Sequence, residues 1–285
     1  MIHIFIPVYN EEQSLKELID NIFSEFAKRN TDFNLLIVDD GSTDNTPNIL
    51  DSYNKHSNVV VYTHSLNRGL GETERDGFEI LARQSKSGDY LIRVEGDNTH
   101  DPKYIFDIIK KLDEGFDVVN TSRFQKGGSQ KGVGPYRSFI SYGANIFMKV
   151  LLRIKDISDF SCGYRGFRAE ALRDAIVVYG KDFLQLRGLG FTSTLEIIVK
   201  MKMLGCRFAE VPFELRYDKK QSSSKMVGSI TTFGYLVISV LYHWPFGGWR
   251  VNYNRLRKNY KKDRKKILNE YTNLEYENFL NDDTK

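Results

Sequence analysis

Three polar strings, each directly after a strand-like apolar run, constrain the fold of this 285-residue chain more than any other feature. They read IPVYNEE from Ile6, VDDGSTDNT from Val38 and VEGDNTHDP from Val94. The carboxyl ends of parallel strands meet at one edge of an open sheet, where nucleotides and metal-bound phosphates bind. The strings therefore predict a nucleotide-using enzyme built on such a sheet.

Strand-like and helix-like segments alternate over the first 122 residues. Apolar runs predict strands at 3–8, 33–40, 58–63, 89–97 and 116–122. Helical spacing predicts helices at 12–28, 44–56 and 71–86, and one opened by Asp101-Pro102. This alternation predicts right-handed crossovers and an α/β, doubly wound, mostly parallel sheet. Beyond it we expect a glycine-rich loop at 126–134, helices at 136–153 and 191–205, a turn at 156–167 and a last strand at 206–215.

The net charge of +4 comes from one segment. Residues 250–266 contain nine Lys or Arg and a single Asp, so the rest of the chain is slightly acidic. A basic tail argues against a nucleic-acid-binding face spread over the fold. Such a tail either meets anionic lipid or is only solvated.

The cysteines and histidines carry little metal or redox signal. Cys162 and Cys206 form no CxxC pair, and the chain starts on a strand-like run without a leader pattern, which predicts a reducing cytosol. The five histidines are scattered, and none pairs with an acid at helical spacing. A zinc site is therefore not expected.

Several turns can contact a nucleotide. The proline-stiffened turn at 7–11 can hold a base or ribose, or can be an ordinary entry into a helix. Asp39 and Asp40 can accept hydrogen bonds from base and ribose, although helix capping needs only one such carboxylate. The turn at 67–71 places Arg68 and two glycines before a helix, which suits a diphosphate.

Glu95 and Asp97 are the sharpest metal candidates. In an extended segment residues i and i+2 face the same way, so both carboxylates can hold one divalent cation. A cation there would neutralise a diphosphate leaving group. Two carboxylates on one face repel each other, which disfavours a purely architectural role.

The ordered motif set resembles glycosyltransferase family 2, and within it the dolichyl-phosphate or polyprenyl-phosphate mannosyltransferase group. The set comprises the three strings above, NRGLG, Ser122-Arg123, DFSCGYRGFR and EVPFELR, and spans about residues 2–226. The resemblance implies a GT-A fold, a nucleotide-sugar donor with GDP-mannose as the first expectation, Mg²⁺ or Mn²⁺, and inversion at the anomeric carbon.

The resemblance also implies site residues. Nucleotide contacts fall on Pro7, Tyr9, Glu11 and Asp39, and the expected set also includes Asp40, Arg68, Gly69 and Gly96. Metal ligands fall on Glu95, Asp97 and Thr99, where the family usually has Asp at the first position and close members have Gln at the last. Acceptor-phosphate contacts fall on Arg123, Arg137, Ser141, Arg216, Ser224 and Lys225. The expected catalytic residues are Asp97, Arg123, Arg137 and Arg216.

The acceptor follows from chemistry. A lipid monophosphate is already an anionic nucleophile at neutral pH, so arginines replace a general base. The alternative is a hydroxyl acceptor in glycan or lipid synthesis, with Glu196 as base unless it only bonds a neighbouring loop. A third reading is a non-catalytic nucleotide-sugar-binding scaffold. Asp159 and Arg165 are expected to form a structural or site-ordering pair.

Residues 226–249 carry no charge and are flanked by cations on both sides. The segment can be an amphipathic helix in the membrane interface, a buried or dimer-forming helix, or a membrane-spanning helix. The flanking cations on both sides favour the membrane interface. Tyr242, Trp244 and Trp249 would then lie at headgroup level. We therefore expect a GT-A domain at 1–225, an interfacial helix at 226–249 and a charged tail at 250–285. The protein is expected on the cytoplasmic membrane face. The expected partners are an anionic membrane surface and polyprenyl phosphate, and a second copy or a membrane protein is a further candidate.

Overall fold

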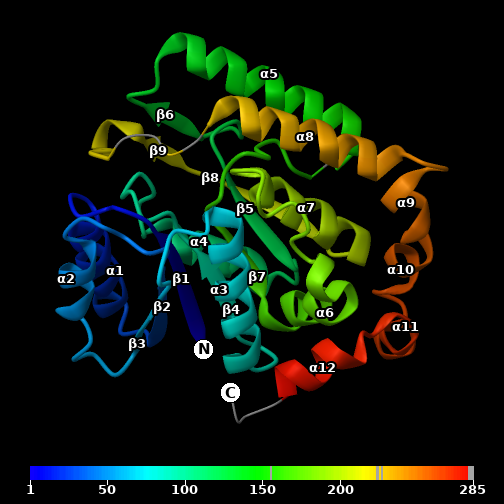
Figure 1. Cartoon of the computed structure of the whole chain (residues 1–285), viewed down its shortest axis with the longest axis horizontal. Helices are drawn as coiled ribbons and strands as arrows, with labels where there is room; N and C mark the ends of the chain where they lie inside the picture. Colours follow the sequence, from blue (N-terminus) through cyan, green and yellow to red (C-terminus); the bar gives the residue numbers. More distant parts are fainter. Residues whose placement is uncertain (155, 223–224, 226, 282–285) are drawn as a thin grey trace.

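A seven-stranded sheet forms the centre of the molecule, in the order β3-β2-β1-β4-β7-β5-β8 (Figure 1). The computed structural model describes residues 1–154, 156–222, 225 and 227–281. The strands are β1 Ile2–Val8, β2 Phe33–Asp39, β3 Val59–Thr63, β4 Tyr90–Arg93, β5 Val118–Ser122, β7 Arg165–Arg168 and β8 Phe208–Pro212. All neighbouring pairs are parallel except those of β7, which runs antiparallel to β4 and β5. The expected mostly parallel α/β sheet is confirmed.

The antiparallel strand β7 was not predicted. Its sequence is only RGFR, too short to show strand periodicity, and we expected a turn there. Gly166 explains how the strand fits, because an added Cβ would lie 2.3 Å from Ile108 of the covering helix. A side chain at Gly166 would push that helix off the sheet.

Two apolar cores cover the two faces of the sheet. Alternate residues of β1 point to opposite sides, so Ile4 and Ile6 join one core while Phe5 joins the other. The helices of the first core are α1 Leu15–Lys28, α2 Thr46–Asp51 and α4 Tyr104–Asp113. Those of the second are α3 Leu70–Gln84, α6 Ala169–Tyr179 and α7 Thr192–Leu204.

The end of the chain folds back over the second core. It forms α8 Gly228–His243, α9 Gly248–Asn252, α10 Asn254–Asn259, α11 Arg264–Tyr271 and α12 Leu274–Asn281. Leu256, Tyr260 and Ile267 are buried, and Tyr260 and Arg264 both donate to Asp174 of α6 at 2.6 Å. Part of the basic segment is thus packed against the domain, and Lys261 donates to the buried Asp117, while Lys258, Lys262, Lys265 and Lys266 are exposed. The domain boundaries at 225 and 249 stay predictions.

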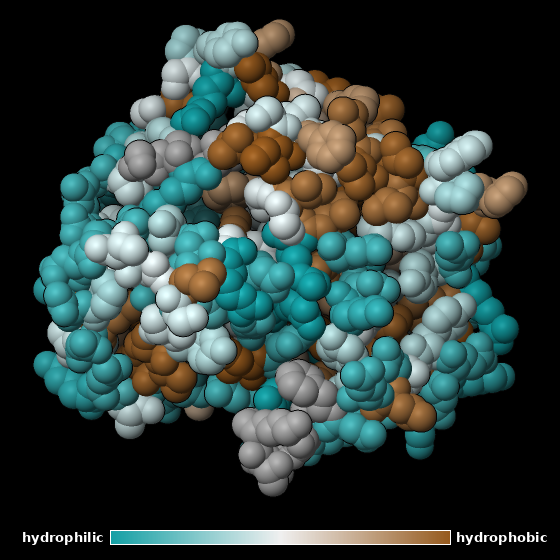
Figure 2. Space-filling model, in the orientation of Figure 1, coloured by the Kyte–Doolittle hydropathy of each residue, from teal (hydrophilic) through white to brown (hydrophobic). Residues whose placement is uncertain are grey.

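Helices α5 (Pro135–Leu152) and α8 lie side by side along one end of the molecule (Figure 1). A small second sheet, β6 Ser129–Lys131 with β9 Glu214–Arg216, lies beside the start of α5. Apolar side chains gather over α5 and α8 (Figure 2). On α5 the exposed ones are Tyr136, Phe139, Ile140, Tyr142, Ile146, Phe147 and Val150; on α8 they are Ile230, Phe233, Leu236 and Val240.

This α5/α8 face differs from an ordinary helix surface. In α8 the buried stripe consists of Thr231, Gly234, Ile238 and Tyr242. Ile230, Phe233, Leu236 and Val240 point outward although they are apolar. Of the aromatics expected at headgroup level, Trp244 is exposed, whereas Tyr242 and Trp249 pack against the protein. Within the described part of the chain, none of the helices combines the length and apolarity needed to span a bilayer.

Candidate active site

The predicted nucleotide residues meet at the carboxyl edge of β1 and β2. The turn that carries Gly96 lies against the end of β1, since a Cβ added there would be 3.1 Å from the Pro7 carbonyl oxygen. Ser14 Oγ, at the start of α1, lies 3.4 Å from the Gly96 carbonyl oxygen. The turns after β1 and β4 therefore form one wall.

Asp39 and Asp40 have different surroundings. Both oxygens of Asp40 accept hydrogen bonds, from the backbone N–H groups of Arg68 at 2.9 Å and Gly69 at 2.8 Å, and His64 lies 2.7 Å from one of them. Asp40 therefore shapes the turn before α3. Asp39 accepts from Ser42 through Oδ1 alone, and its buried Oδ2 has no hydrogen-bond partner among the described residues. That oxygen is the one available to a ligand.

Glu11 lies at the same edge and is almost fully buried. It accepts from Ser14 Oγ at 3.0 Å and binds the ammonium of Lys225, which also donates to the Asn10 carbonyl at 2.9 Å. Tyr9 is half-buried beside them. The predicted acceptor-loop residue Lys225 is thus placed at the nucleotide wall, and Ser224 lies outside the described residues.

Glu95 and Asp97 bind different cations. Glu95 accepts two hydrogen bonds from the guanidinium group of Arg93, with oxygen–nitrogen distances of 2.5 and 3.2 Å. The buried Arg93 also contacts Glu74 at 2.8 Å. Asp97 binds Lys220 and accepts from Thr99 Oγ1 at 2.7 Å. The i and i+2 pattern extends back to Arg93, whose buried charge needs a counter-ion, and this is why Glu95 does not face Asp97 alone.

Lys220 stands as a cation at the predicted metal position. Burial would raise the pKa of Asp97, but the ammonium of Lys220 outweighs it and holds that pKa below its usual value. The charges of Glu11 and Glu95 act with Asp97 to raise the pKa of Lys220 against its burial. Asp97 therefore offers a carboxylate oxygen to a positive charge, and Thr99 donates to the other carboxylate oxygen. Within the described residues, no three His, Cys, Asp or Glu side chains gather closely enough to hold a metal by themselves.

Arg123, just after β5, forms the second polar cluster. Its Nε donates to Asp159 Oδ2 at 2.7 Å and its Nη2 to Oδ1 at 2.8 Å, and Nη2 also reaches Ser161 at 2.7 Å and Ser141 of α5 at 3.3 Å. Burial would raise the pKa of Asp159, but the guanidinium lowers it. The structure thus brings together two predicted acceptor residues, Arg123 and Ser141.

The expected pairing of Asp159 with Arg165 is wrong. Arg165 is buried and donates to the backbone carbonyls of Thr194, at 2.7 Å, and Cys162. Arg165 lies in the antiparallel strand β7, which the sequence did not reveal, so its side chain points into the core between sheet and α7. Asp159 forms its ion pair with Arg123 instead.

The other two arginines lie on the rim. Arg137, in the first turn of α5, is exposed, and its guanidinium carbon lies 5.2 Å from the centre of the Tyr217 ring. Arg216, at the end of β9, pairs with Asp218 at 2.7 Å. Both are near the small sheet and not in direct contact with Arg123, so a ligand would have to bridge them.

Glu196 has a structural position. It is fully buried and accepts from the backbone N–H groups of Gln185 and Leu186, both at 2.9 Å. Lys200 lies 4.0 Å away on the next turn of α7. A carboxylate occupied by a loop in this way is poorly placed to act as a base for a hydroxyl acceptor.

Sequence reasoning missed two features of the site. Lys220 belongs to a basic loop, DKKQSSSKM, in which only Ser224 and Lys225 were predicted as site residues. The apolar face of α5 was also missed, although its many aromatic and branched residues were visible in the sequence.

Solved structures share this fold. The glucosyl-3-phosphoglycerate synthase of Mycobacterium tuberculosis, in complex with Mn²⁺, UDP and phosphoglyceric acid, is similar with a TM-score of 0.57 and 19% identity, over 85% of this chain and 77% of that one. The same synthase with Mg²⁺ and UDP gives a TM-score of 0.56 over 85% and 78% of the two chains, at 19% identity. The sheet, its flanking helices and the acidic carboxyl edge define an α/β protein of the GT-A-like class.

The chain belongs to glycosyl transferase family 2, whose family model matches residues 3–175. It is 30% identical to a dolichol-phosphate mannosyltransferase of Pyrococcus furiosus over 236 residues, 82% of this chain and 61% of that relative's length. It is 29% identical to an uncharacterized protein of Methanocaldococcus jannaschii over 81% of this chain and 88% of that one. The expected enzyme class, a glycosyltransferase, is confirmed.

Proposed function

We propose that this glycosyltransferase transfers a hexose from a nucleotide sugar to polyprenyl or dolichyl phosphate. The donor that we expect first is GDP-mannose, which would transfer mannose. One observation carries the proposal: the Arg123 cluster reaches Ser141 on a helix whose outer surface is apolar. A phosphate on a long hydrocarbon chain needs a cationic group beside an apolar surface. The relative named as a dolichol-phosphate mannosyltransferase supports the same substrate class.

The donor would bind along the first wall. The unpartnered Asp39 Oδ2 would accept from the base or ribose, and Tyr9 and Pro7 would border the same space. Asp40 would act indirectly by holding Arg68 and Gly69 in the turn before α3. A buried carboxylate oxygen without a partner is costly, so a ligand donor there would recover free energy.

A divalent cation fits the site at Asp97. Asp97 and the hydroxyl of Thr99 would hold Mg²⁺ or Mn²⁺, with Glu95 contributing in addition to its contact with Arg93. When bound, the ion would neutralise the charge that develops on the diphosphate. Lys220 already places one positive charge beside Asp97.

The acceptor phosphate would lie between Arg123 and the rim arginines, Arg137 and Arg216. One phosphate oxygen would form the new bond to the anomeric carbon from the face opposite the nucleotide. The bond from that carbon to the diphosphate oxygen would break, and its electron pair would leave with the nucleotide. Planar guanidinium groups bind phosphate oxygens well. The phosphate acceptor is already an anion, so no residue has to remove a proton from it.

The α5/α8 face would place the enzyme on the cytoplasmic membrane surface as a peripheral protein. Contiguous exposed apolar patches of this kind mark membrane or protein contacts. The face begins beside Arg137 and Ser141, so a prenyl chain could enter along it while its phosphate reaches Arg123.

The test is transfer by the purified chain from a panel of GDP- and UDP-sugars to polyprenyl phosphate, with the unphosphorylated polyprenol as matched control. We expect a glycosyl phosphate product by mass spectrometry with the phosphate acceptor alone. Chelator should abolish it, and Mg²⁺ or Mn²⁺ should restore it. Transfer to polyprenol or another hydroxyl, without transfer to the phosphate, would refute the proposal.

A further inference from the structure

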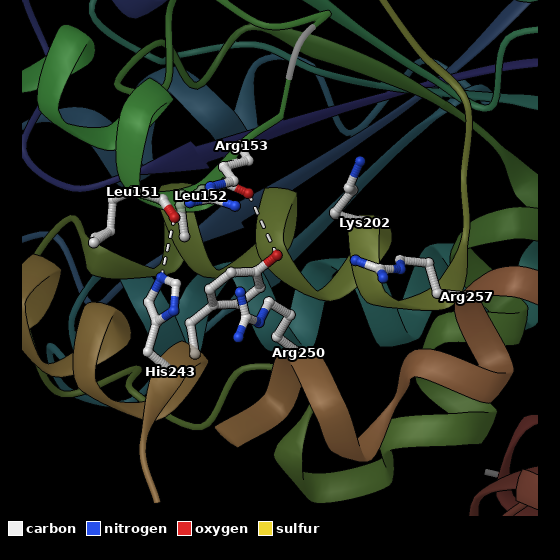
Figure 3. Close-up of a pocket in the computed structure, with 8 residues that line it drawn as sticks. Leu151, Leu152, Arg153, Lys202, His243, Arg250 and Arg257 are labelled. Atoms are coloured by element: carbon white, nitrogen blue, oxygen red, sulfur yellow. Dashed lines mark hydrogen bonds between the residues drawn. The ribbon is translucent and has the colours of Figure 1, made fainter. Parts of the chain in front are cut away.

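A cationic cavity lies at the far end of the α5/α8 face (Figure 3). It has a volume of about 240 Å³ and lies where α5 and α8 end against α7, α9 and α10. Its lining residues are Leu151, Leu152, Arg153, Lys202, Tyr242, His243, Arg250 and Arg257. None of the predicted active-site residues is among them.

Four different segments supply the positive charges. Arg153 follows α5, Lys202 is on α7, and Arg250 and Arg257 are on α9 and α10. No acidic residue is among the described side chains that line the cavity. Arg153, Arg250 and Arg257 bring like charges together, and their mutual repulsion costs free energy unless an anion is bound.

The nearby helix ends do not neutralise these charges. The Leu152 carbonyl accepts from Tyr242 Oη at 3.3 Å, and the Leu151 carbonyl lies 3.0 Å from His243 Nε2 (Figure 3). These two carbonyl oxygens at the C-terminal end of α5, which would otherwise attract cations, are thus already bonded. Arg153, Arg250 and Arg257 line the cavity beside these bonded carbonyls.

Exposed apolar side chains, called the rim residues below, lie next to the lining residues along the chain. Val150 and Val251 adjoin lining residues in the chain, and Trp244 and Phe246 follow the end of α8. Phe246 is 96% exposed and Trp244 69%. An anion site rimmed by exposed aromatic and aliphatic groups fits a ligand that is anionic at one end and apolar at the other.

We propose that this cavity binds the headgroup phosphate of an anionic phospholipid while the rim residues enter the hydrocarbon. The site is separate from that of the acceptor, so the inference goes beyond the proposed transfer reaction. Part of the affinity for an anionic membrane would then come from this cavity, in addition to the general attraction between the membrane and the basic segment at 250–266.

Vesicle binding tests the assignment on the full chain. Binding is measured by co-sedimentation on phosphatidylcholine vesicles and on equimolar phosphatidylcholine and phosphatidylglycerol vesicles. The variant is Arg153→Gln with Arg250→Gln. The matched control is Lys265→Gln with Lys266→Gln, which removes the same charge from exposed positions of α11, away from the α5/α8 face (Figure 1).

We expect the pocket variant to bind the anionic vesicles at least about tenfold more weakly, and the control to change less than about twofold. Thermal unfolding checks that the variants fold, and Arg250→Gln alone serves if the double variant does not. Transfer to a short, soluble acceptor phosphate should be unchanged, which separates this test from the proposed function.

Other results would overturn the inference. Equal losses in both double variants would mean diffuse electrostatic attraction, and no loss in either would mean that the cavity takes no part. Inorganic phosphate or glycerol phosphate binding without lipid, with no difference between vesicles, would identify a soluble anion. A stable dimer in light scattering that masks the α5/α8 face would assign that face to a second copy.

Discussion

Lys220 donates from its ammonium group to the carboxylate of Asp97, at the position where the sequence predicts a divalent metal. The two residues are 123 positions apart in the chain, and the contact brings the loop after β9 onto the turn after β4. Metal and ammonium would therefore compete for the same oxygen. This competition can be measured without turnover.

Replacing Lys220 with Met should strengthen Mn²⁺ binding in the absence of nucleotide. A hydrogen bond between charged groups contributes about 1.5–3 kcal/mol, so we expect roughly tenfold tighter binding by calorimetry. Lys219→Met is the control, since Lys219 pairs with Glu17 on the surface at 3.3 Å. Weaker Mn²⁺ binding in the Lys220 variant would show that Lys220 supports the metal site instead.

Substitutions of Arg137 and of Arg123 should differ in their effects on acceptor KM and on the free energy of unfolding. Arg137→Gln changes an exposed side chain, so acceptor KM should rise about 10- to 100-fold with folding and donor affinity nearly unchanged. Arg123→Gln should also lower the free energy of unfolding by roughly 3–5 kcal/mol, because it leaves Asp159 buried without its charge partner. Steady-state kinetics and urea unfolding measure both. Loss of nucleotide binding with acceptor KM retained would reverse the assignment.

Glu196→Gln separates the two acceptor classes. Because Glu196 bonds the 185–186 backbone, the variant should lose roughly 1–3 kcal/mol of stability, with kcat within a few-fold of the parent. The assay must be run well below the variant's unfolding temperature. A loss of kcat by several orders of magnitude in a folded variant would indicate a general base.

Gly234 controls how closely α8 approaches α7. A Cβ added there would lie 1.9 Å from Thr192 Oγ1, so Gly234→Ala should cost roughly 1–3 kcal/mol in the free energy of unfolding. Gly228→Ala, where nothing lies within 4 Å of the added Cβ, is the matched control. Chemical unfolding measures both. Equal stability of the two variants would mean that α8 shifts freely.

Lys200 should give the protein a stability change in mild alkali. Burial lowers the pKa of its ammonium to about 8, against the opposing effect of Glu196. The unfolded chain, with a pKa of 10.5, then binds more protons than the folded one between those two values. This change in protonation makes the free energy of unfolding rise with pH over that interval, by roughly 3 kcal/mol in total.

Lys200→Met lacks the titrating group, so its stability relative to the parent should fall as pH rises from 8 to 10.5. Urea unfolding at a series of pH values gives the difference. A difference that stays constant across the series would contradict a lowered pKa.

The sequence predicted the parallel strands well because each is a buried apolar run that ends in a polar turn. It did not predict β7 or α6, since RGFR is too short for a period and the helix directly follows it. The pairing of Glu95 with Arg93 also escaped prediction. An i and i+2 pattern gives a shared face, but it does not say which neighbour neutralises which charge.

The packed C-terminal segment shows a similar limit. Leu256, Tyr260 and Ile267 are widely spaced among nine cations. The sequence pattern of this segment is therefore mainly charged, and it did not indicate that these three side chains are buried. Removing the chain after Trp249 would therefore uncover the second core as well as remove charge. On α5 the sequence predicted the helix, but only the tertiary structure shows that its apolar side has no covering element among the described residues.

The length of α5 separates two anion sites on one face. Arg137 lies in its first turn and Arg153 just beyond its last, 16 residues apart. At 1.5 Å per residue this is about 24 Å along the helix axis. A single phosphate group cannot span that distance, so the cavity and the catalytic arginines would have to be occupied by two different lipid molecules at once, one held and one consumed.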